Sequence, residues 1–264
     1  MAGTSREATV RVAMCQTVCL AGDRSGNVAR IERACEEAAA QDAQIACFPE
    51  TALLGWVNDA AHQRACPIPG PDADRLCALA RRFKLGLCVG LAEKEAARLY
   101  DSALLIDPEG RILLKHRKLN ILTHLMTPPY TPGTEVTVVS TPWGRVGVLI
   151  CADTFESAHC QALREQRAEL VLVPYGWAAP EENWPGHGNE LRKVVQSAAR
   201  QAHAPVVGVD SVGQITCGLW CGWVFGGQSV AVDATGEVLV TLADRDREVR
   251  VVDVPVDRRN SGTA

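Results

Sequence analysis

Short apolar segments alternate along this sequence with longer segments whose apolar residues recur every three to four positions. The first of the short segments, Thr9 to Cys15, has the length and valine content of a β-strand, and 28–42 then has the spacing of a helix. The same alternation predicts further strands at 44–48, 85–92, 170–174, 206–209 and 249–254, and further helices at 72–83, 155–167 and 189–203. Helices of this kind must cover a sheet, so the pattern predicts one α/β domain with helices on both sides of a sheet.

Three hairpins interrupt this alternation, and each surrounds a short sequence typical of a turn. The turns are expected at 107–110, 141–144 and 234–236, between the strand pairs 100–106 and 111–115, 136–140 and 145–150, and 229–233 and 237–242. Hairpin strands are antiparallel, so the sheets must be mixed. No linker or change of composition divides the sequence, which predicts a single domain over residues 1–264.

Composition and charge exclude several classes of protein. The net charge is −4 and the densest cationic run, Lys115 to Lys118, has only four residues, so we expect no nucleic-acid partner. The sequence has no run of about 18 apolar residues, so we expect no membrane span. The segment from Met1 to Ala8 lacks the apolar core of a secretory signal, which favours the cytoplasm.

The eleven cysteines indicate neither a zinc site nor a disulfide framework. Most lie in apolar patterns, as Cys47 and Cys88 do, where a thiol acts as a small hydrophobic group. No pair has the C-x-x-C spacing of a zinc site, and the odd total argues against complete pairing. A cysteine-rich redox or metal protein is therefore the less favoured hypothesis, and we expect no metal.

Three reactive side chains directly follow predicted strands, where the functional groups of α/β proteins collect. They are Glu50, Lys118 and Cys151. Taken singly, each has an ordinary structural explanation. Glu50 could be a cap or a surface charge, Lys118 a solvated charge and Cys151 a packed thiol. Together they form a chemical set, because a thiol with a pKa of about 8.5 needs a base to remove its proton. A cation then stabilises the thiolate and the developing oxyanion, so the set predicts acyl transfer through a thioester.

The segments around these residues resemble the three signature motifs of the nitrilase superfamily of carbon–nitrogen hydrolases. They read Phe48-Pro49-Glu50-Thr51, His116-Arg117-Lys118-Leu119 and Gly147-Val148-Leu149-Ile150-Cys151-Ala152-Asp153, with the three residues separated by 68 and 33 positions. Tyr130-Thr131-Pro132-Gly133 resembles the turn before the family's cysteine strand, and 226–236 resembles its late hairpin. The resemblance spans roughly residues 9–254.

This resemblance implies a four-layer α-β-β-α sandwich with mixed sheets, in subunits that form a homodimer or a larger homo-oligomer. It implies Cys151 as the nucleophile, Glu50 as the general base and Lys118 as the cation beside the oxyanion. The backbone N–H of Ala152 would be a second oxyanion donor. The implied partner is a small-molecule amide, with no metal or organic cofactor.

The sequence departs from the family's pattern in two places. Many members carry a second glutamate shortly before the turn that contains Tyr130, but 121–130 has no carboxylate. His124 is the candidate auxiliary residue there, as a positioning group or proton relay, and the alternative is an ordinary loop histidine. True nitrilases typically have Trp-Glu after the nucleophile, whereas this chain has Ala152 and Asp153, which favours amide over nitrile substrates. Asp153 is expected to bond nearby backbone groups.

The substrate pocket is predicted from aromatic residues that lie in loops near the motifs. Tyr130, Trp177 and Trp184 are its candidates, and packing or a dimer interface is the alternative for the tryptophans. The sequence thus favours an amidase acting on linear amides. An N-carbamoyl amide hydrolase, a nitrilase, and a ligand-binding member of the fold without hydrolytic activity remain alternatives.

Overall fold

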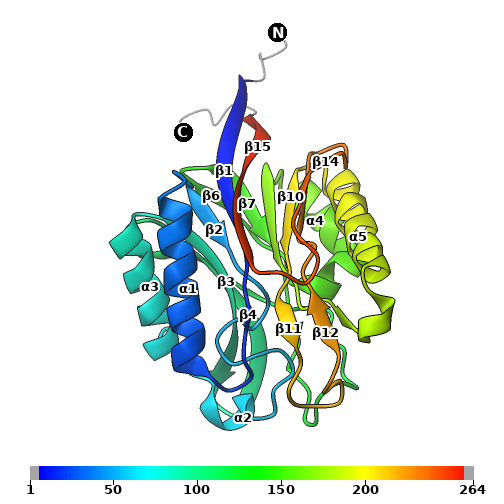
Figure 1. Cartoon of the computed structure of the whole chain (residues 1–264). Coiled ribbons are helices and arrows are strands. Elements are labelled where there is room, and N and C mark those ends of the chain that lie inside the picture. Colours follow the sequence, from blue (N-terminus) through cyan, green and yellow to red (C-terminus); the bar gives the residue numbers. More distant parts are fainter. Residues whose placement is uncertain (1–5, 259–264) are drawn as a thin grey trace.

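The computed structural model describes residues 6–258, in which two six-stranded sheets pack against each other between two layers of helices (Figure 1). This is the four-layer α-β-β-α sandwich with mixed sheets that the sequence motifs implied. The expectation that Met1 to Ala8 is not a secretory signal rests largely on residues 1–5, which lie outside the described range.

The first sheet has the strand order β15-β1-β2-β3-β4-β5. Its strands are β1 (Arg6–Gln16), β2 (Ile45–Cys47), β3 (Gly86–Glu95), β4 (Arg98–Ile106), β5 (Ile112–Arg117) and β15 (Glu248–Arg258). Strand β2 is parallel to both of its neighbours, and the other pairs are antiparallel. Helices α1 (Arg24–Ala39) and α3 (Pro71–Phe83) cover its outer face, and the one-turn helix α2 (Ala61–Arg64) lies at one end (Figure 1).

The second sheet has the order β14-β13-β10-β8-β7-β6 and is covered by two helices. Its strands are β6 (Val138–Thr141), β7 (Gly144–Val148), β8 (Leu170–Pro174), β10 (Val206–Val209), β13 (Val230–Val232) and β14 (Val238–Thr241). The helices are α4 (Ser157–Glu165) and α5 (Gly186–Ala202). A small third sheet contains β9 (Ala178–Ala179), β11 (Val212–Gln214) and β12 (Val224–Gly226), and the short 3₁₀ helices are η1 (Cys151–Phe155) and η2 (Glu181–Asn183).

The side chains of β1 show how the layers form. Val10, Val12 and Met14 pack in the core between the sheets, whereas Ala13 and Cys15 pack toward α1 and α3. Side chains of a strand alternate between the two faces, so both faces of this strand are buried and the whole segment reads as apolar.

Alternation alone predicted helices on both sides of one sheet, and in this respect it was wrong. Each large sheet carries helices on one face and the other sheet on its opposite face. An apolar strand has the same sequence pattern whether a helix or a second sheet covers it, so the pattern could not separate the two arrangements.

The predicted helices and strands were confirmed, apart from shifts of a few residues at their ends. The pairing of β3 with β4 in a hairpin was not predicted, although both strands were. Neither α2 nor the small third sheet was predicted, and the strands of that sheet have only two or three residues each. Segments this short do not establish a periodicity.

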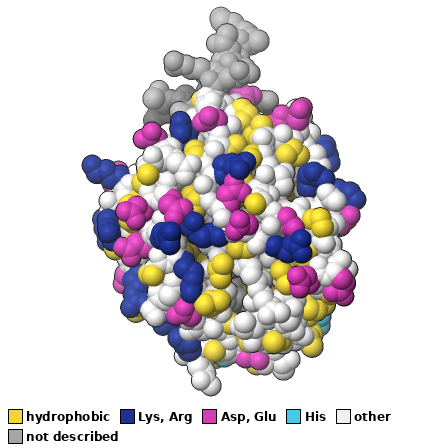
Figure 2. All heavy atoms as spheres, viewed as in Figure 1, with side chains coloured by type: hydrophobic (Ala, Val, Ile, Leu, Met, Phe, Trp, Pro, Cys, Tyr) yellow, Lys and Arg dark blue, Asp and Glu magenta, His cyan; other side chains and the backbone are white. Residues whose placement is uncertain are grey.

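On the face shown in Figure 2, cationic and anionic side chains are interspersed rather than gathered into one basic patch.

Gly90 on β3 lets the segment that contains Glu50 lie directly against the first sheet. Its N–H donates to the Pro49 carbonyl at 3.3 Å, and its own carbonyl accepts from the Ala52 N–H at 2.8 Å. A Cβ atom at position 90 would lie 2.7 Å from both the Cα of Glu50 and the carbonyl oxygen of Pro49. These are backbone atoms, which cannot move aside as a flexible side chain can.

We therefore expect Gly90→Ala to lower the free energy of unfolding by about 1–3 kcal/mol, because the added methyl group overpacks this contact. Denaturant unfolding measures the change. The control is Gly186→Ala, since a Cβ atom at position 186 would meet nothing within 4 Å. That variant should stay within about 0.5 kcal/mol of the wild type. Equal stabilities for all three proteins would contradict the close approach at Gly90.

Candidate active site

Glu50 and Lys118 form a buried ion pair at the end of the first sheet. The Lys118 Nζ lies 2.5 Å from Glu50 Oε1, and the two residues are 5% and 2% exposed. Glu50 follows β2, and its backbone N–H donates to the Tyr175 carbonyl at 3.1 Å, which lies just after β8 of the second sheet. The carboxylate is thus fixed where the two sheets meet.

Lys118 directly follows β5 and is held by both its backbone and its side chain. Its N–H donates to the Asp101 carbonyl at 2.8 Å, and its Nζ lies 3.6 Å from Asp101 Oδ2. Burial alone lowers the pKa of the Lys118 ammonium, but the negative charge of Glu50 and the acidic groups of Cys151 and Asp101 beside it raise it well above the usual value. Lys118 therefore stays charged at neutral pH.

Cys151 begins η1, which follows the last strand residues of β7. Its backbone has a φ of +42°, an uncommon conformation for a residue other than glycine, and its carbonyl accepts a 2.7 Å hydrogen bond from Thr154 Oγ1. The residue is 4% exposed. Burial, and then the negative charge of Glu50, raise the pKa of the Cys151 thiol well above its usual value, although Lys118 and the Gly176 N–H oppose this. Cys151 is therefore a neutral thiol at rest and needs a base.

The Asp153 carboxylate ties the segment of Lys118 to the turn of Cys151. Its Oδ1 accepts from the backbone N–H groups of Leu119 and Asn120, both at 2.8 Å. Its Oδ2 accepts from the Ile150 N–H at 3.0 Å and is bonded to His116 Nε2 at 2.8 Å. Asp153 is fully buried, and its hydrogen bonds to nearby backbone groups are those expected from the sequence.

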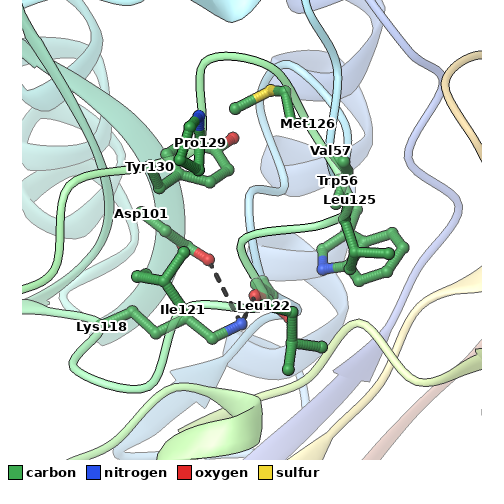
Figure 3. A pocket seen from close by; sticks show the side chains of 11 residues that line it. Trp56, Val57, Asp101, Lys118, Ile121, Leu122, Leu125, Met126, Pro129 and Tyr130 are labelled. Carbon is green, nitrogen blue, oxygen red and sulfur yellow. Dashed lines mark hydrogen bonds and ion pairs between the residues drawn. The ribbon is translucent and has the colours of Figure 1, made fainter.

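A cavity of about 330 Å³, part of it open to solvent, lies beside the ion pair (Figure 3). Its polar side chains are those of Glu50, Asp101, Lys118 and Tyr130. The rest of its wall is apolar and consists of Trp56, Val57, Ile121, Leu122, Leu125, Met126 and Pro129. The cavity can therefore bind a small molecule with an apolar group and hold a polar group beside the cation.

The structure brings one of the three predicted pocket residues, Tyr130, to this cavity, and the other two lie elsewhere. The Trp177 ring stacks on His187 with ring centroids 5.0 Å apart. The Trp184 ring packs over Gly226 and donates to the Val224 carbonyl at 3.2 Å. Trp56 supplies the tryptophan of the cavity instead, and its position six residues after Glu50 was the signal that the sequence analysis overlooked.

His124 is exposed and does not line the cavity, so the structure gives no support to its candidate auxiliary role. Its loop turns the neighbouring apolar side chains Leu122, Leu125 and Met126 inward, which leaves the histidine toward solvent. A second carboxyl group does lie near Lys118: Asp101 on β4 places its Oδ2 3.6 Å from Nζ.

The described residues contain neither a metal-binding cluster nor a disulfide. Within residues 6–258, no group of three or more His, Cys, Asp or Glu side chains is arranged to hold a metal ion. All eleven cysteines are free thiols. No helix of the described chain is long and apolar enough to cross a membrane.

The chain is similar to known proteins in both sequence and fold. The sequence model of the carbon–nitrogen hydrolase family matches residues 11–261. An (R)-stereoselective amidase from Pseudomonas sp. is 34% identical over 241 residues, which cover 90% of this chain and 82% of that protein. A bifunctional nitrilase/nitrile hydratase from Oryza sativa subsp. japonica is 33% identical over 195 residues, but the alignment covers 64% of this chain and only 54% of the relative.

Solved structures of an amidase from Nesterenkonia sp. AN1 share the fold. One, in which a cysteine is replaced by serine, has a TM-score of 0.81 and 25% identity, and the match covers 93% of this chain and 92% of that one. Another carries the acetamide moiety of fluoroacetamide on its active-site cysteine; its TM-score is 0.82 at 24% identity, over 96% and 94% of the two chains.

The Asp153 junction makes stability depend on pH. Burial raises the pKa of the Asp153 carboxyl, but the hydrogen bond and charge of His116, the Asn120 N–H and the charge of Lys118 together hold it below its usual value. Such a carboxylate stabilises the fold above its unfolded pKa of about 3.9, and this contribution is lost as the pH falls through the folded value.

We therefore expect Asp153→Asn to lower the free energy of unfolding at pH 7 by about 1–3 kcal/mol, because buried donors lose a charged acceptor. The difference from the wild type should shrink below about pH 4. Denaturant unfolding at both pH values measures it, with Asp246→Asn at an exposed position as the control. A loss of the same size at every pH would show that the charge of Asp153 is not responsible.

Proposed function

The chain belongs to the carbon–nitrogen hydrolase family, and from this we propose that it is an amidase that cleaves small linear amides through a thioester on Cys151. The observation that carries the proposal is the convergence of Glu50, Lys118 and Cys151 from the ends of strands in two different sheets. A base, a cation and a thiol are the groups that this chemistry requires.

Glu50 is the general base of the proposed reaction. Cys151 is a neutral thiol at rest, so Glu50 takes the proton from Sγ as the sulfur attacks the amide carbonyl. The protonated Glu50 then gives this proton to the departing nitrogen, and ammonia or an amine leaves. The acyl group stays on Sγ as a thioester, and Glu50 is again a carboxylate.

Lys118 and the backbone N–H of Ala152 stabilise the oxyanion that forms during the attack. Lys118 is charged and buried, so its ammonium acts on the oxyanion with little screening by water. Ala152 is the first residue after the nucleophile in η1. In the second half of the cycle, Glu50 takes a proton from water as the water attacks the thioester, and the acid and the Cys151 thiol are released.

The comparisons favour amides over nitriles as substrates. The alignment with the amidase covers most of both chains, whereas the chain spans about half the length of the curated nitrilases it matches. The cavity wall beyond Glu50 and Lys118 is largely apolar, which suits a small uncharged acyl group.

Three broader features of the chain stay predictions. They are a single catalytic domain over residues 1–264, a homodimer or larger homo-oligomer, and a location in the cytoplasm.

A screen of primary amides, ureido acids and nitriles, read out by ammonia release, tests the activity and the substrate class. Cys151→Ala should abolish release from every substrate that the wild type hydrolyses, because no other group can form the thioester. Glu50→Gln should lower kcat by about 100-fold or more. The control is Cys35→Ala, which removes a buried thiol from α1 and should leave kcat unchanged.

Activity that survives Cys151→Ala would contradict the proposed nucleophile. Release of ammonia from ureido acids or nitriles alone would replace the amidase with a carbamoylase or a nitrilase. If no substrate is turned over and no covalent adduct on Cys151 is found by intact mass, the chain is a ligand-binding member of the fold.

A further inference from the structure

The Lys118 ammonium lies beside two buried carboxyl groups, although one is enough to pair its charge. Glu50 Oε1 is 2.5 Å from Nζ, and Asp101 Oδ2 is 3.6 Å from it; both acidic residues are 2% exposed. A second negative charge in a buried site is costly unless it is paired or neutralised. The proposed reaction uses Glu50 as its base and leaves the role of Asp101 open.

The β4–β5 ladder places Asp101 next to Lys118. Ser102 is paired with Arg117, and the ladder continues in a 2.8 Å hydrogen bond from the Lys118 N–H to the Asp101 carbonyl. Figure 3 shows the Asp101 carboxyl group reaching from its strand to the Lys118 Nζ at the edge of the cavity. The contact therefore belongs to the rigid part of the first sheet, not to a mobile loop.

The surroundings of Asp101 favour its neutral form. Burial, and then the negative charge of Glu50, raise the pKa of its carboxyl well above the usual range, although Lys118 opposes this. The other ionisable groups that face it are Asp153 and Tyr130, and neither brings a positive charge. Asp101 Oδ1 has no hydrogen-bond partner among the described residues. No donor therefore stabilises a negative charge on this oxygen.

We propose that Asp101 is a positioning residue for the amidase reaction, which keeps the Lys118 ammonium in place while Glu50 carries the proton of Cys151. The inference rests on the proposed function. When Glu50 takes the thiol proton it becomes neutral, and Lys118 loses the carboxylate that paired with it. Asp101 Oδ2, 3.6 Å from Nζ, is then the nearby oxygen toward which the ammonium can turn, and it prevents the ammonium from moving away from the oxyanion.

Asp101 fulfils this role best without a charge. A neutral carboxyl group holds the ammonium through its oxygen but does not cancel the positive charge that the thiolate and oxyanion require. An ionised Asp101 would add a negative charge near Cys151 and disfavour the thiolate. The arrangement thus separates two tasks: Glu50 moves protons, and Asp101 fixes the cation.

Two substitutions at position 101 test this role. Asp101→Asn keeps an oxygen that can accept from Nζ and cannot ionise, so kcat at pH 7 should stay within about threefold of the wild type. Asp101→Ala removes the oxygen, and kcat should fall by about 10- to 100-fold with KM little changed, because the cation is displaced from the transition state. At alkaline pH the wild type should lose activity as Asp101 ionises, whereas the Asn variant should not.

A second readout does not depend on the substrate. Iodoacetamide alkylates the thiolate form of a cysteine, so the alkylation rate at Cys151 reports how well Lys118 supports that form. Peptide mass mapping separates Cys151 from the other ten thiols. We expect Asp101→Ala to slow this alkylation by about tenfold at pH 7, and Asp101→Asn to leave it within about twofold of the wild type.

The matched control is Asp107→Asn, a buried aspartate in the turn that follows β4, which accepts from the backbone and side chain of Arg111. This variant should lower the melting temperature but change neither kcat nor the alkylation of Cys151. If Asp101→Ala behaves in the same way, or if Asp101→Asn is as impaired as Asp101→Ala, the positioning role is wrong. If the wild type hydrolyses no amide, the proposed function is wrong instead. The alkylation rates would still decide the role of Asp101.

Discussion

The buried carboxylate of Asp153 is the interaction on which the rest of the site depends. Its oxygens accept from the N–H groups of Leu119 and Asn120, just after Lys118, and from the N–H of Ile150, just before Cys151. These segments leave different sheets, so no single ladder of hydrogen bonds fixes their distance. The Asp153 side chain fixes the distance between the two segments, although it does not line the cavity.

Gly90 and Gly176 allow the backbone of both sheets to pack closely around Glu50 at the same junction. A Cβ atom on Gly90 would meet the backbone of Glu50, and one on Gly176 would lie 2.8 Å from Glu50 Oε2 and 2.6 Å from the Trp56 ring. Glu50 therefore lies between two backbone surfaces that approach it from opposite sheets. Such close packing excludes water and strengthens the interaction of its carboxylate with the Lys118 ammonium.

The sequence predicted the elements of the fold and the central trio more fully than the residues around them. Glu50, Lys118 and Cys151 could be found because each lies within three residues of the end of a strand. Asp101 could not, because the ladder shifts by one residue between Leu105 and Ile106, where β4 faces β5. Without this bulge Lys118 would face Tyr100, and a one-residue slip turns every side chain to the opposite face. Trp177 and Trp184 were proposed because they follow the nucleophile in the sequence, but neither lines the cavity beside the ion pair.

The buried, neutral state of Cys151 also bears on its response to oxidants. Peroxides react with thiolates and far more slowly with thiols, and Cys151 is both 4% exposed and protonated at rest. We therefore expect the sulfur of the resting protein to react slowly with peroxides, although Cys151 is the proposed nucleophile. Sulfenic acid formation is then expected mainly when Glu50 holds the proton and no acyl group is attached to the sulfur.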